Sequence, residues 1–314
     1  MVNRNKPSVA SYASAQKEWK YMLFLDAIEQ YFECRQVPCI IRGDWMSIGD
    51  SGENYDLDLW FRRYEQVNPQ EYPICIEQHL NTLQKTMQLE KEIQRHDHDF
   101  DFIRPYLATT LYKHDCFDPE SLSEIVCDSQ SGDLLTTLVF DLPTLMEPVR
   151  IKQTEHWQLS LSELLALGKE NIRQKYPLEY QETGFRNDSI FKVQTSHRFA
   201  VNFLFELDKH PRLLGVKGSL VAMPSYNQLW IYPINSLRLI AVLKELMIRI
   251  STLYAKLPDP LTPDIYWYRR HSFTTALTLK PQSRHSYHFS SELADLITRM
   301  AKKRYLHEVF GQWN

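Results

Sequence analysis

Glycine is scarce in this sequence, and its few copies stand apart from one another. The chain has 9 glycines in 314 residues, whereas average proteins contain about 7% glycine. No group of them matches a dinucleotide-binding fingerprint or a P-loop, which need glycines for tight turns and for close approach to phosphate. The sequence therefore disfavours nucleotide binding of these kinds, and we expect no cofactor.

Paired cysteines and long apolar runs are also missing. The five cysteines form no Cys-x-x-Cys pair, so we expect reduced and mostly buried thiols. Residues 1–25 contain no apolar signal core, and no run approaches the roughly 18 apolar residues that a membrane-spanning helix needs. We therefore expect a cytoplasmic protein that makes no membrane contact.

Charge is present in ordinary amounts but is unevenly distributed along the chain. Segment 44–147 contains 21 Asp or Glu and 7 Lys or Arg, whereas segment 1–43 has a net charge of +2 and segment 148–314 one of +9. Such a segment is usually a solvated surface, and the more specific interpretation is an acidic face for a basic protein partner. We expect no nucleic-acid binding there, because phosphates are neutralised by Lys and Arg.

Apolar periodicity predicts helices and strands that follow one another without strict alternation. Helices are predicted at residues 14–35, 57–66, 69–94, 118–126, 159–176, 197–208, 235–257 and 290–305. Strands are predicted at residues 37–43, 44–50, 102–112, 134–142, 189–196, 218–233 (a hairpin), 264–270 and 272–279. This order indicates an α+β fold with mixed or antiparallel sheets and long amphipathic helices. A soft boundary near 145–155 and the change of charge indicate two halves of similar size, 1–147 and 148–314.

Two local patterns are more specific. Ser160 followed by Glu163 has the spacing of a capping box at the start of an amphipathic helix. In the strand 264–270, the alternation of side chains makes Tyr266 and Tyr268 core candidates and places Trp267 on the opposite face.

The string Gly49-Asp50-Ser51-Gly52 is similar to sequences around catalytic serines, but the chain lacks the partners that such a serine needs. In trypsin-like proteases the base is a histidine earlier in the chain, and here the first histidine is His79. Esterases with an early Gly-Asp-Ser need a late Asp-x-x-His pair, and none of the eleven histidines has Asp three residues before it. We therefore interpret Ser51 as part of a turn and identify no catalytic residue.

The sequence "HDHDFD" raises the question of a metal site. His96, His98 and Asp99 are the candidate ligands. On a strand the histidines would share one face and the aspartates the other, and neither set completes a zinc site. We expect a polar connection between a helix and a strand, and no metal.

The order of several segments resembles a family of uncharacterised bacterial proteins that includes the YtpQ proteins of Bacillus. The similarity lies in "LDLWFRRYEQ", "EYPICIEQHL" and "FIRPYLATTLY", and continues in "LLTTLVFDL", "LSELLALGKENI", "LVAMPSYNQLWIYP" and "DPLTPDIYWYR". It covers roughly residues 45–275. The hairpin has Tyr226-Asn227 where the family has a charged Arg-Asp-like pair. The family brings no established reaction, cofactor or catalytic residue, and it implies that "GDSGEN" is a variable turn.

Candidate binding residues come from the segments that carry this resemblance. They are Arg62, Arg63, Tyr64, Arg104, Asn171, Tyr226 and Asn227. Two neighbouring arginines on a helix can clamp a carboxylate, although a surface or intramolecular ion pair is the commoner arrangement for such residues.

Two functional hypotheses follow from the sequence. The first is a binding or interaction protein without its own catalytic site, and an immunity-type inhibitor is one version of it. The alternative is a hydrolase with a dispersed metal or acid–base site. A pocket that combines His and Asp with strongly shifted pKa values would favour the enzyme, whereas an exposed acidic plane without a pocket would favour the binder. The sequence leaves the oligomeric state open.

Overall fold

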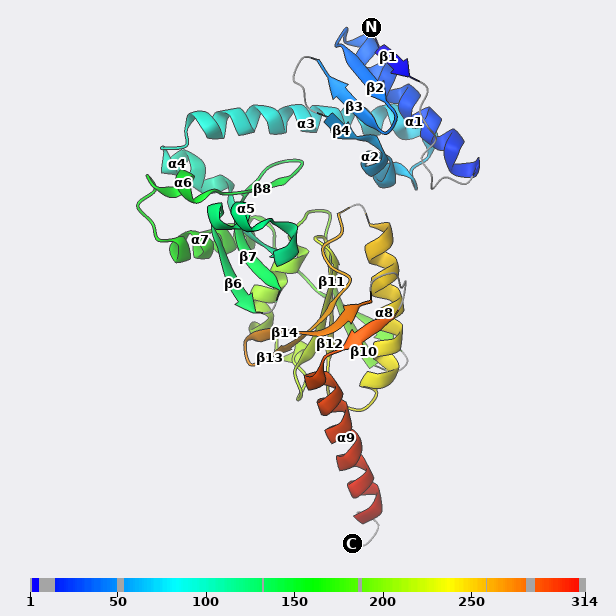
Figure 1. Cartoon of the computed structure of the whole chain (residues 1–314), viewed down its shortest axis with the longest axis vertical. Helices are drawn as coiled ribbons and strands as arrows, with labels where there is room; N and C mark the ends of the chain where they lie inside the picture. The colour runs from blue at the N-terminus through cyan, green and yellow to red at the C-terminus, as the bar shows by residue number, and fades with distance from the viewer. Residues whose placement is uncertain are drawn as a thin grey trace. The chain divides into compact units, whose positions relative to one another are not determined.

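Figure 1 shows the computed structural model of the chain, which describes residues 2–5, 15–49, 54–131, 133–185, 188–257, 259–280 and 286–310. The chain forms two compact units. Unit 1 consists of Met1–Glu92 and Pro143–Leu145, and unit 2 consists of Ile93–Leu142 and Met146–Asn314. Each unit combines helices with paired strands, so the predicted α+β class is confirmed.

Unit 1 contains a four-stranded sheet and three α-helices among its described residues. The strand order is β1-β2-β3-β4, with a parallel β1–β2 pair and antiparallel pairs after it. The elements are β1 (Val2–Asn5), α1 (Ala15–Cys34), β2 (Cys39–Arg42), β3 (Trp45–Ile48), β4 (Asn54–Asp56), α2 (Leu57–Tyr64), η1 (Pro69–Glu71) and α3 (Tyr72–Arg95). The end of α3 already falls in unit 2. The apolar faces of the helices and the sheet meet in one core, which includes Phe24, Ile28 and Trp60. These helices confirm the ones predicted at 14–35, 57–66 and 69–94.

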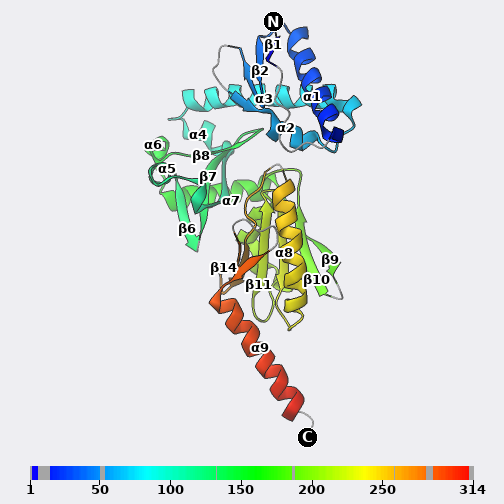
Figure 2. The same ribbon diagram turned by 45° about the vertical axis from the view of Figure 1, so that its right-hand side comes forward.

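A seven-stranded antiparallel sheet forms the larger part of unit 2. Its strand order is β15-β14-β13-β11-β12-β10-β9. The strands are β9 (Gln181–Phe185), β10 (Asp188–Gln194), β11 (Ser219–Ser225), β12 (Gln228–Pro233), β13 (Ile265–Arg269), β14 (Ser272–Leu279) and β15 (Tyr287–Phe289). Helix α8 (Leu239–Lys256) covers one face, and the 3-10 helix η4 (Ala200–Lys209) covers the other. Figures 1 and 2 both show α8 alongside this sheet. After the last strand, α9 (Ser291–Phe310) begins.

Because both faces of this sheet are covered, alternate residues of β13 enter different cores. Tyr266 and Tyr268 pack in the core beneath η4, and Trp267 packs in the core beneath α8. The alternation predicted for these three residues is confirmed.

A second sheet in unit 2 is smaller and has an edge that matters for the site. Strands β5, β7 and β6 pair antiparallel in that order, and β8 also pairs with β7. Their bounds are β5 (Leu107–Lys113), β6 (Cys127–Ser131), β7 (Leu134–Asp141) and β8 (Met146–Pro148). Helix α7 (Leu161–Lys175) packs against β5, which is the edge strand. The short helices of unit 2 are α4 (Phe100–Ile103), η2 (Arg104–Tyr106), η3 (His114–Cys116), α5 (Pro119–Glu124), α6 (Ile151–Thr154) and η5 (Pro211–Leu213).

Two predicted elements of unit 2 differ from the structure. The strand expected at 102–112 begins only at Leu107, because Asp99 starts a short helix by accepting a hydrogen bond from the Phe102 amide (3.2 Å). Pro105 then lies in the first turn of η2, where its missing N–H costs nothing. The helix expected at 197–208 is a 3-10 helix, η4, that begins at Ala200.

The two compact units do not coincide with the halves 1–147 and 148–314 drawn from the charge pattern. The chain leaves unit 2 after β7, contributes Pro143–Leu145 to unit 1, and returns for β8. The segment that interrupts the sequence pattern contains these three residues of unit 1. Strands β5 to β7, which come before it, belong to unit 2 together with residues 146–314. None of the helices that the structure describes is both long enough and apolar enough to span a membrane.

Candidate functional site

The candidate residues of helix α2 are held by neighbours within unit 1. Arg62 forms an ion pair of 2.9 Å with Asp58 one turn earlier, the arrangement that sequence reasoning regarded as common. Arg63 lies beside it and is half-buried. The hydroxyl of Tyr64 lies 2.7 Å from His79 Nδ1, and burial raises the pKa of Tyr64 to about 12.

Arg104 and Asn171 are predicted residues from separate segments that the structure brings together. The side-chain amide of Asn171 on α7 donates hydrogen bonds of 2.8 Å to the carbonyl oxygens of Arg104 and Leu107. Arg104 lies just before the edge strand β5, and Leu107 is the first residue of that strand. The Asn171 amide therefore fixes α7 to the sheet. The side chain of Arg104 is exposed.

Tyr226 and Asn227 form the turn between β11 and β12. The ring of Tyr226 lies 5.6 Å from that of Tyr112, and burial raises the pKa of its hydroxyl. Asn227 Oδ1 accepts a hydrogen bond of 2.6 Å from Ser225 Oγ. The Asn227 carbonyl accepts a second hydrogen bond, from the Thr195 amide (3.1 Å). The turn is therefore tied to its surroundings by its own polar groups.

The "HDHDFD" segment does not form a ligand cluster in the structure. His98 Nδ1 lies 3.2 Å from Asp97, the ring of His96 packs against Phe102, and Asp99 caps α4. Across the described residues, no group of three or more His, Cys, Asp or Glu is arranged to hold a metal ion. Ser51 lies outside the described residues.

Unit 2 contains a pocket that none of these motifs identified. It has a volume of about 450 Å³ and opens between α7 and η4. Its lining consists of Ala166, Lys169, Glu170, Ile172, Arg173, Tyr176, Pro177, Leu178, Asn202, Phe205, Glu206 and Lys209. The volume lies within the roughly 300–1,000 Å³ that is usual for small-molecule sites.

The sequence positions α7 through its capping box and its single glycine. Ser160 Oγ accepts from the Glu163 amide (3.3 Å) and Glu163 accepts from the Ser160 amide (2.8 Å), so the predicted capping box is confirmed. Gly168 faces β5 so closely that a Cβ atom would lie 2.7 Å from the carbonyl carbon of Ala108. Because residues one turn apart share a helix face, this contact leaves Lys169 and Arg173 on the pocket side.

Asn202 forms the buried floor of the pocket. Its side chain is 5% exposed, and its Nδ2 donates to the carbonyl of Thr109 on the free edge of β5. Its Oδ1 atom is buried and has no hydrogen-bond donor among the described residues. A buried acceptor without a donor is costly, and because this atom is fully buried an occupant of the pocket does not reach it in this structure.

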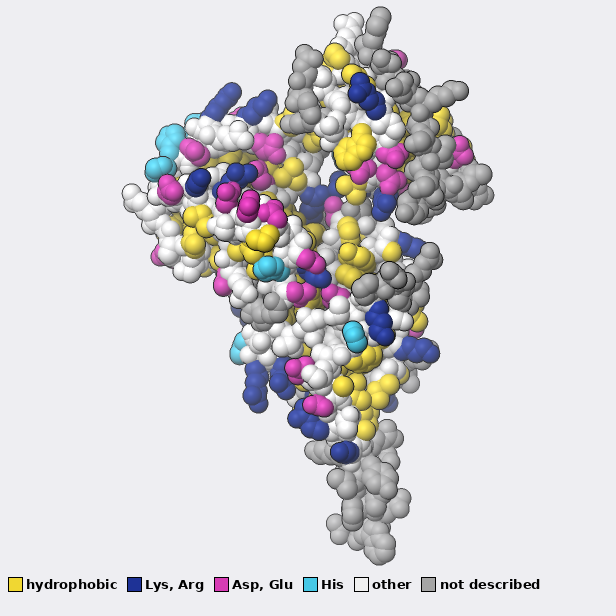
Figure 3. Space-filling view, in the orientation of Figure 1, with side chains coloured by type: hydrophobic (Ala, Val, Ile, Leu, Met, Phe, Trp, Pro, Cys, Tyr) yellow, Lys and Arg dark blue, Asp and Glu magenta, His cyan; other side chains and the backbone are white. Residues whose placement is uncertain are grey.

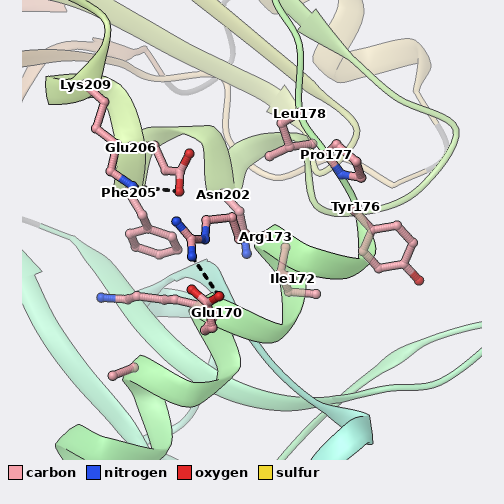
Figure 4. Close-up of a pocket in the computed structure, with 12 residues that line it drawn as sticks. Glu170, Ile172, Arg173, Tyr176, Pro177, Leu178, Asn202, Phe205, Glu206 and Lys209 are labelled. Carbon is pink, nitrogen blue, oxygen red and sulfur yellow. Dashed lines mark hydrogen bonds and ion pairs between the residues drawn. The ribbon is translucent and has the colours of Figure 1, made fainter.

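Charged side chains flank this floor, and most of them are paired. Figure 4 shows Arg173 between Glu170 and Glu206, with an ion pair of 2.7 Å to Glu170 and another of 3.1 Å between Lys209 and Glu206. The hydrogen bonds from Arg173 and Gln174 hold the pKa of Glu170 below its usual value.

Lys169 differs from the other cations of the pocket. Its Nζ atom lies 4.5 Å from the centre of the Phe205 ring, a cation–π contact. No carboxylate lies within ion-pair distance of it in the described part of the chain. Burial lowers its pKa, and the more distant Asp128 partly offsets this effect.

A second polar cluster adjoins one end of the pocket. The Tyr176 hydroxyl donates to Asp141 (3.0 Å), and Lys175 pairs with the same carboxylate at 2.5 Å. The ring of His197 stacks on Tyr176 at 4.3 Å, and burial lowers the pKa of His197 while Asp141 opposes the shift. His197 does not line the pocket, so the structure does not combine His and Asp within it.

No family model matches this chain. No curated protein matches it, and no solved structure does either. The assignment of the pocket as a candidate site therefore rests on its geometry.

Sequence reasoning did not identify Lys169, Asn202 or Phe205. It named Asn171, which lies next to the pocket but faces the sheet. One sequence signal could have found the lysine: Lys169 and Arg173 are four residues apart and therefore share a helix face, whereas the neighbouring Gly168 indicates a close-packed face. No local signal marks Asn202, because its partner Thr109 is 93 positions away.

Proposed function

We propose that this protein is a binding protein and that the pocket between α7 and η4 is its ligand site. The observation that carries the proposal is Lys169, a half-buried cation that contacts the Phe205 ring in the lining of a pocket of about 450 Å³ and has no carboxylate within ion-pair distance among the described residues. Apolar side chains such as Ile172, Leu178 and Phe205 share this lining with charged ones, and a concave site of this size that combines the two is a usual form of small-molecule site.

The experiment is a fragment screen by ligand-observed NMR on three forms of the full chain. Ala166 is exposed and lines the pocket, so Ala166→Phe fills the space without entering the core. Ala241 is an exposed alanine of α8, and Ala241→Phe is the matched control. We expect fragments that bind the wild type and the control but not Ala166→Phe. Fragments that bind all three equally, or the absence of any binding fragment, would refute the proposal.

The hydrolase alternative is less well supported by the site. The pocket lining contains no histidine, and His197, the histidine that adjoins it, accepts a hydrogen bond at Nδ1 from the Phe199 amide (3.2 Å). General-base chemistry needs a group within hydrogen-bond reach of the substrate, and the two carboxylates of the lining, Glu170 and Glu206, are held in ion pairs. Membership of the YtpQ-like family and a cytoplasmic location stay predictions, and they are compatible with a binding protein.

A second version of the binding proposal concerns the acidic region 44–147. Unit 1 contains 14 Asp or Glu and 10 Lys or Arg, whereas unit 2 contains 25 and 26. Within unit 2 the acidic segment has partners of its own, such as Asp141 with Lys175 and Glu124 with Arg150. Figure 3 accordingly shows acidic and basic side chains side by side on the surface of unit 2. We therefore confine the proposed contact with a basic protein to the part of the region in unit 1, segment 44–92.

Pull-down from host lysate at low and moderate salt tests this second version. Exposed charges are screened beyond about 8–10 Å near physiological ionic strength, so a basic partner should be recovered at low salt and released at moderate salt. Recovery of no protein, or of a protein whose binding does not change with salt, would contradict this version.

A further inference from the structure

One end of the seven-stranded sheet presents cations that have no carboxylate partner. Strand β11 pairs with β13 through Ser219 and Tyr268, so the loop before β11 and the turn after β13 lie at the same end of the sheet. Lys217, Arg269 and Arg270 are exposed in these two segments. None of the three has a carboxylate within ion-pair distance in the part of the chain that the structure describes.

Arg269 and the loop before β11 are held against each other. The guanidinium of Arg269 lies 4.6 Å from the centre of the Trp267 ring, and Trp267 Nε1 donates a hydrogen bond of 2.8 Å to the Lys217 carbonyl. A Cβ atom on Gly218 would lie 3.2 Å from the Cβ of Arg269. A guanidinium that stacks on a ring is partly fixed in orientation, while its N–H groups stay open to an anion.

The same loop holds an apolar side chain in solvent. Val216 is 83% exposed, although its amide donates to Asn235 Oδ1 (2.9 Å) and the Lys217 amide donates to the Ile234 carbonyl (3.0 Å). A Cβ atom on Gly215 would clash with the Ile234 amide nitrogen, so the loop backbone packs directly against the chain after β12. The fold therefore fixes an exposed valine next to a cation.

The turn that carries Arg270 is strained, and the contacts of Arg270 do not explain the strain. Strands β13 and β14, which lie side by side in Figure 1, are joined by Arg270 and His271 with φ values of 52° and 61°. Such turns favour Asn-Gly, because most side chains are strained at positive φ. His271 has a contact within the fold, since its Nδ1 lies 2.5 Å from Asp208. Arg270 forms no ion pair, side-chain hydrogen bond or cation–π contact with the described residues, so its charge is available to a partner.

Nucleic acid is a poor match for this surface. Single strands are bound by stacking of bases on exposed aromatic rings, and Trp267 is only 3% exposed. The exposed side chain between the cations is the aliphatic Val216, which gains nothing from a phosphate backbone. An apolar side chain on the partner would instead bury it.

An anionic lipid surface is also a poorer match, because carboxylates stand among these cations. Asp208 is 38% exposed and pairs with His271, the neighbour of Arg270. Asp188 pairs with Arg238 at 3.7 Å where β10 begins, at the same end of the sheet. A flat anionic surface that covered Arg270 would also approach these carboxylates, and like charges repel. A protein segment can place its carboxylates at the unpaired cations.

We propose that Val216, Lys217, Arg269 and Arg270 form a basic docking surface for an acidic segment of another protein, in which carboxylates flank an apolar side chain. The carboxylates pair with the three cations, and the apolar side chain covers Val216. None of these four residues lines the α7–η4 pocket, so this surface is independent of the proposed ligand site.

The experiment is fluorescence anisotropy of labelled synthetic peptides with the full chain. In the first set, glutamates flank one central apolar residue. In the second set serine replaces the apolar residue, and in the third set glutamine replaces each glutamate. The first set should bind more tightly than the second, and the third should not bind. Binding of the first set should weaken as salt is added, because exposed charges are screened.

Removal of two cations tests the ionic contacts. The double variant Lys217→Gln with Arg270→Gln leaves the stacked Arg269 in place and should weaken the first set by about fivefold or more. Lys244 and Lys256 are exposed lysines of α8, and Lys244→Gln with Lys256→Gln is the control of equal charge, with wild-type affinity.

Two further variants separate docking from a structural role. Val216→Ser should lower the affinity of the first set to that of the second and leave the second unchanged, whereas Ile240→Ser, at an exposed isoleucine of α8, should change neither. Arg270→Asn places a residue that tolerates positive φ in the turn, so it should raise the melting temperature and still weaken the first set.

Three results would overturn the inference: no binding by the first set, equal affinities of the first and second sets, or an affinity that the Lys217→Gln with Arg270→Gln variant keeps. Vesicles of phosphatidylserine with phosphatidylcholine and a single-stranded oligonucleotide probe the other anionic surfaces. Tighter binding of either than of the first peptide set, lost in the same double variant, would also overturn it. Ala166→Phe should leave the peptide affinities unchanged, so the proposed ligand site is tested separately.

Discussion

Helices α7 and α8 both pack against sheets of unit 2, but they do so with different side chains. Helix α8 inserts Leu239, Val242, Leu243, Leu246 and Ile250 into a continuous apolar core. Helix α7 approaches β5 through Gly168 and a hydroxyl contact, from Thr109 Oγ1 to the Leu165 carbonyl (2.9 Å), and through the amide of Asn171.

The difference teaches where a site can form. Interlocking apolar side chains fill the space between a helix and a sheet and leave little room for a ligand. Helix α7 also buries Leu164, Leu165 and Ile172, but at Gly168 and at its hydrogen bonds it meets the edge strand without an apolar side chain between them. Its remaining faces are then free to carry groups such as Lys169 and Arg173, and the pocket lies on that side.

Removal of an apolar side chain from α8 should have the largest effect on stability. Leu243 is 2% exposed in the core beneath α8, and Leu243→Ala should lower the free energy of unfolding by about 2–5 kcal/mol, through lost burial and a residual cavity. Urea denaturation measures this loss. Ligand binding in the α7–η4 pocket should persist. Loss of binding in a folded Leu243→Ala protein would contradict the proposal that α8 supports the core and α7 supports the site.

Addition of a methyl group to α7 should have the next largest effect on stability. Gly168→Ala places a Cβ against the Ala108 backbone, which cannot move aside, and should cost about 1–3 kcal/mol of unfolding free energy. The control is Gly184→Ala in β9, where a Cβ meets nothing within 4 Å; it should be neutral or stabilise by up to about 1 kcal/mol. Equal results for the two variants would show that α7 does not depend on close approach.

Removal of the Asn171 amide should have a smaller effect than the added methyl group at Gly168. Asn171→Ala removes two donors and should cost about 1–2 kcal/mol. Asn171→Asp keeps the shape but turns a carboxylate toward the carbonyls of Arg104 and Leu107, so it should cost more than Asn171→Ala. The reverse order in thermal denaturation would mean that these hydrogen bonds do not hold α7.

The smallest expected effect is a pH dependence at the end of α7. Burial lowers the pKa of His197 in the folded chain, so the unfolded chain takes up the proton first. The stability contribution is fully present above the unfolded pKa of about 6.5 and is lost as pH falls through the folded pKa. His197→Gln should flatten the stability profile between pH 7.5 and about 5, with Asp141, Tyr176 and Lys175 unchanged around it. Helix α8 contains no histidine, so Leu243→Ala should keep the wild-type slope. An unchanged slope in His197→Gln would contradict this account.

Much of the fold could be predicted from the sequence, because its signals are local. The capping box of Ser160 and Glu163 and the alternation around Trp267 depend on neighbours within a few residues. The strand expected from 102 failed because the Asp99 cap and Pro105 favour helical turns over the apolar pattern.

The site was less accessible to prediction, for the same physical reason. Its floor depends on a hydrogen bond from Asn202 to Thr109, which joins two segments that are distant in the chain. Asn202 lies in an apolar run between Val201 and Phe203 and shows no pattern of its own. The family resemblance indicated Asn171 as a binding residue, whereas the hydrogen bonds of Asn171 show that it supports α7.

The side-chain amide of Asn202, a residue of the pocket lining, offers the most direct test of the central claim, that the α7–η4 pocket binds a ligand. Its two N–H protons can be followed in a ¹⁵N–¹H correlation spectrum while a fragment that binds the wild type but not Ala166→Phe is added, with the amide of Asn171 as an internal reference. The account predicts that the Asn202 resonances shift in a saturable way and that those of Asn171 stay in place. Saturable binding that leaves the Asn202 resonances unmoved would contradict it.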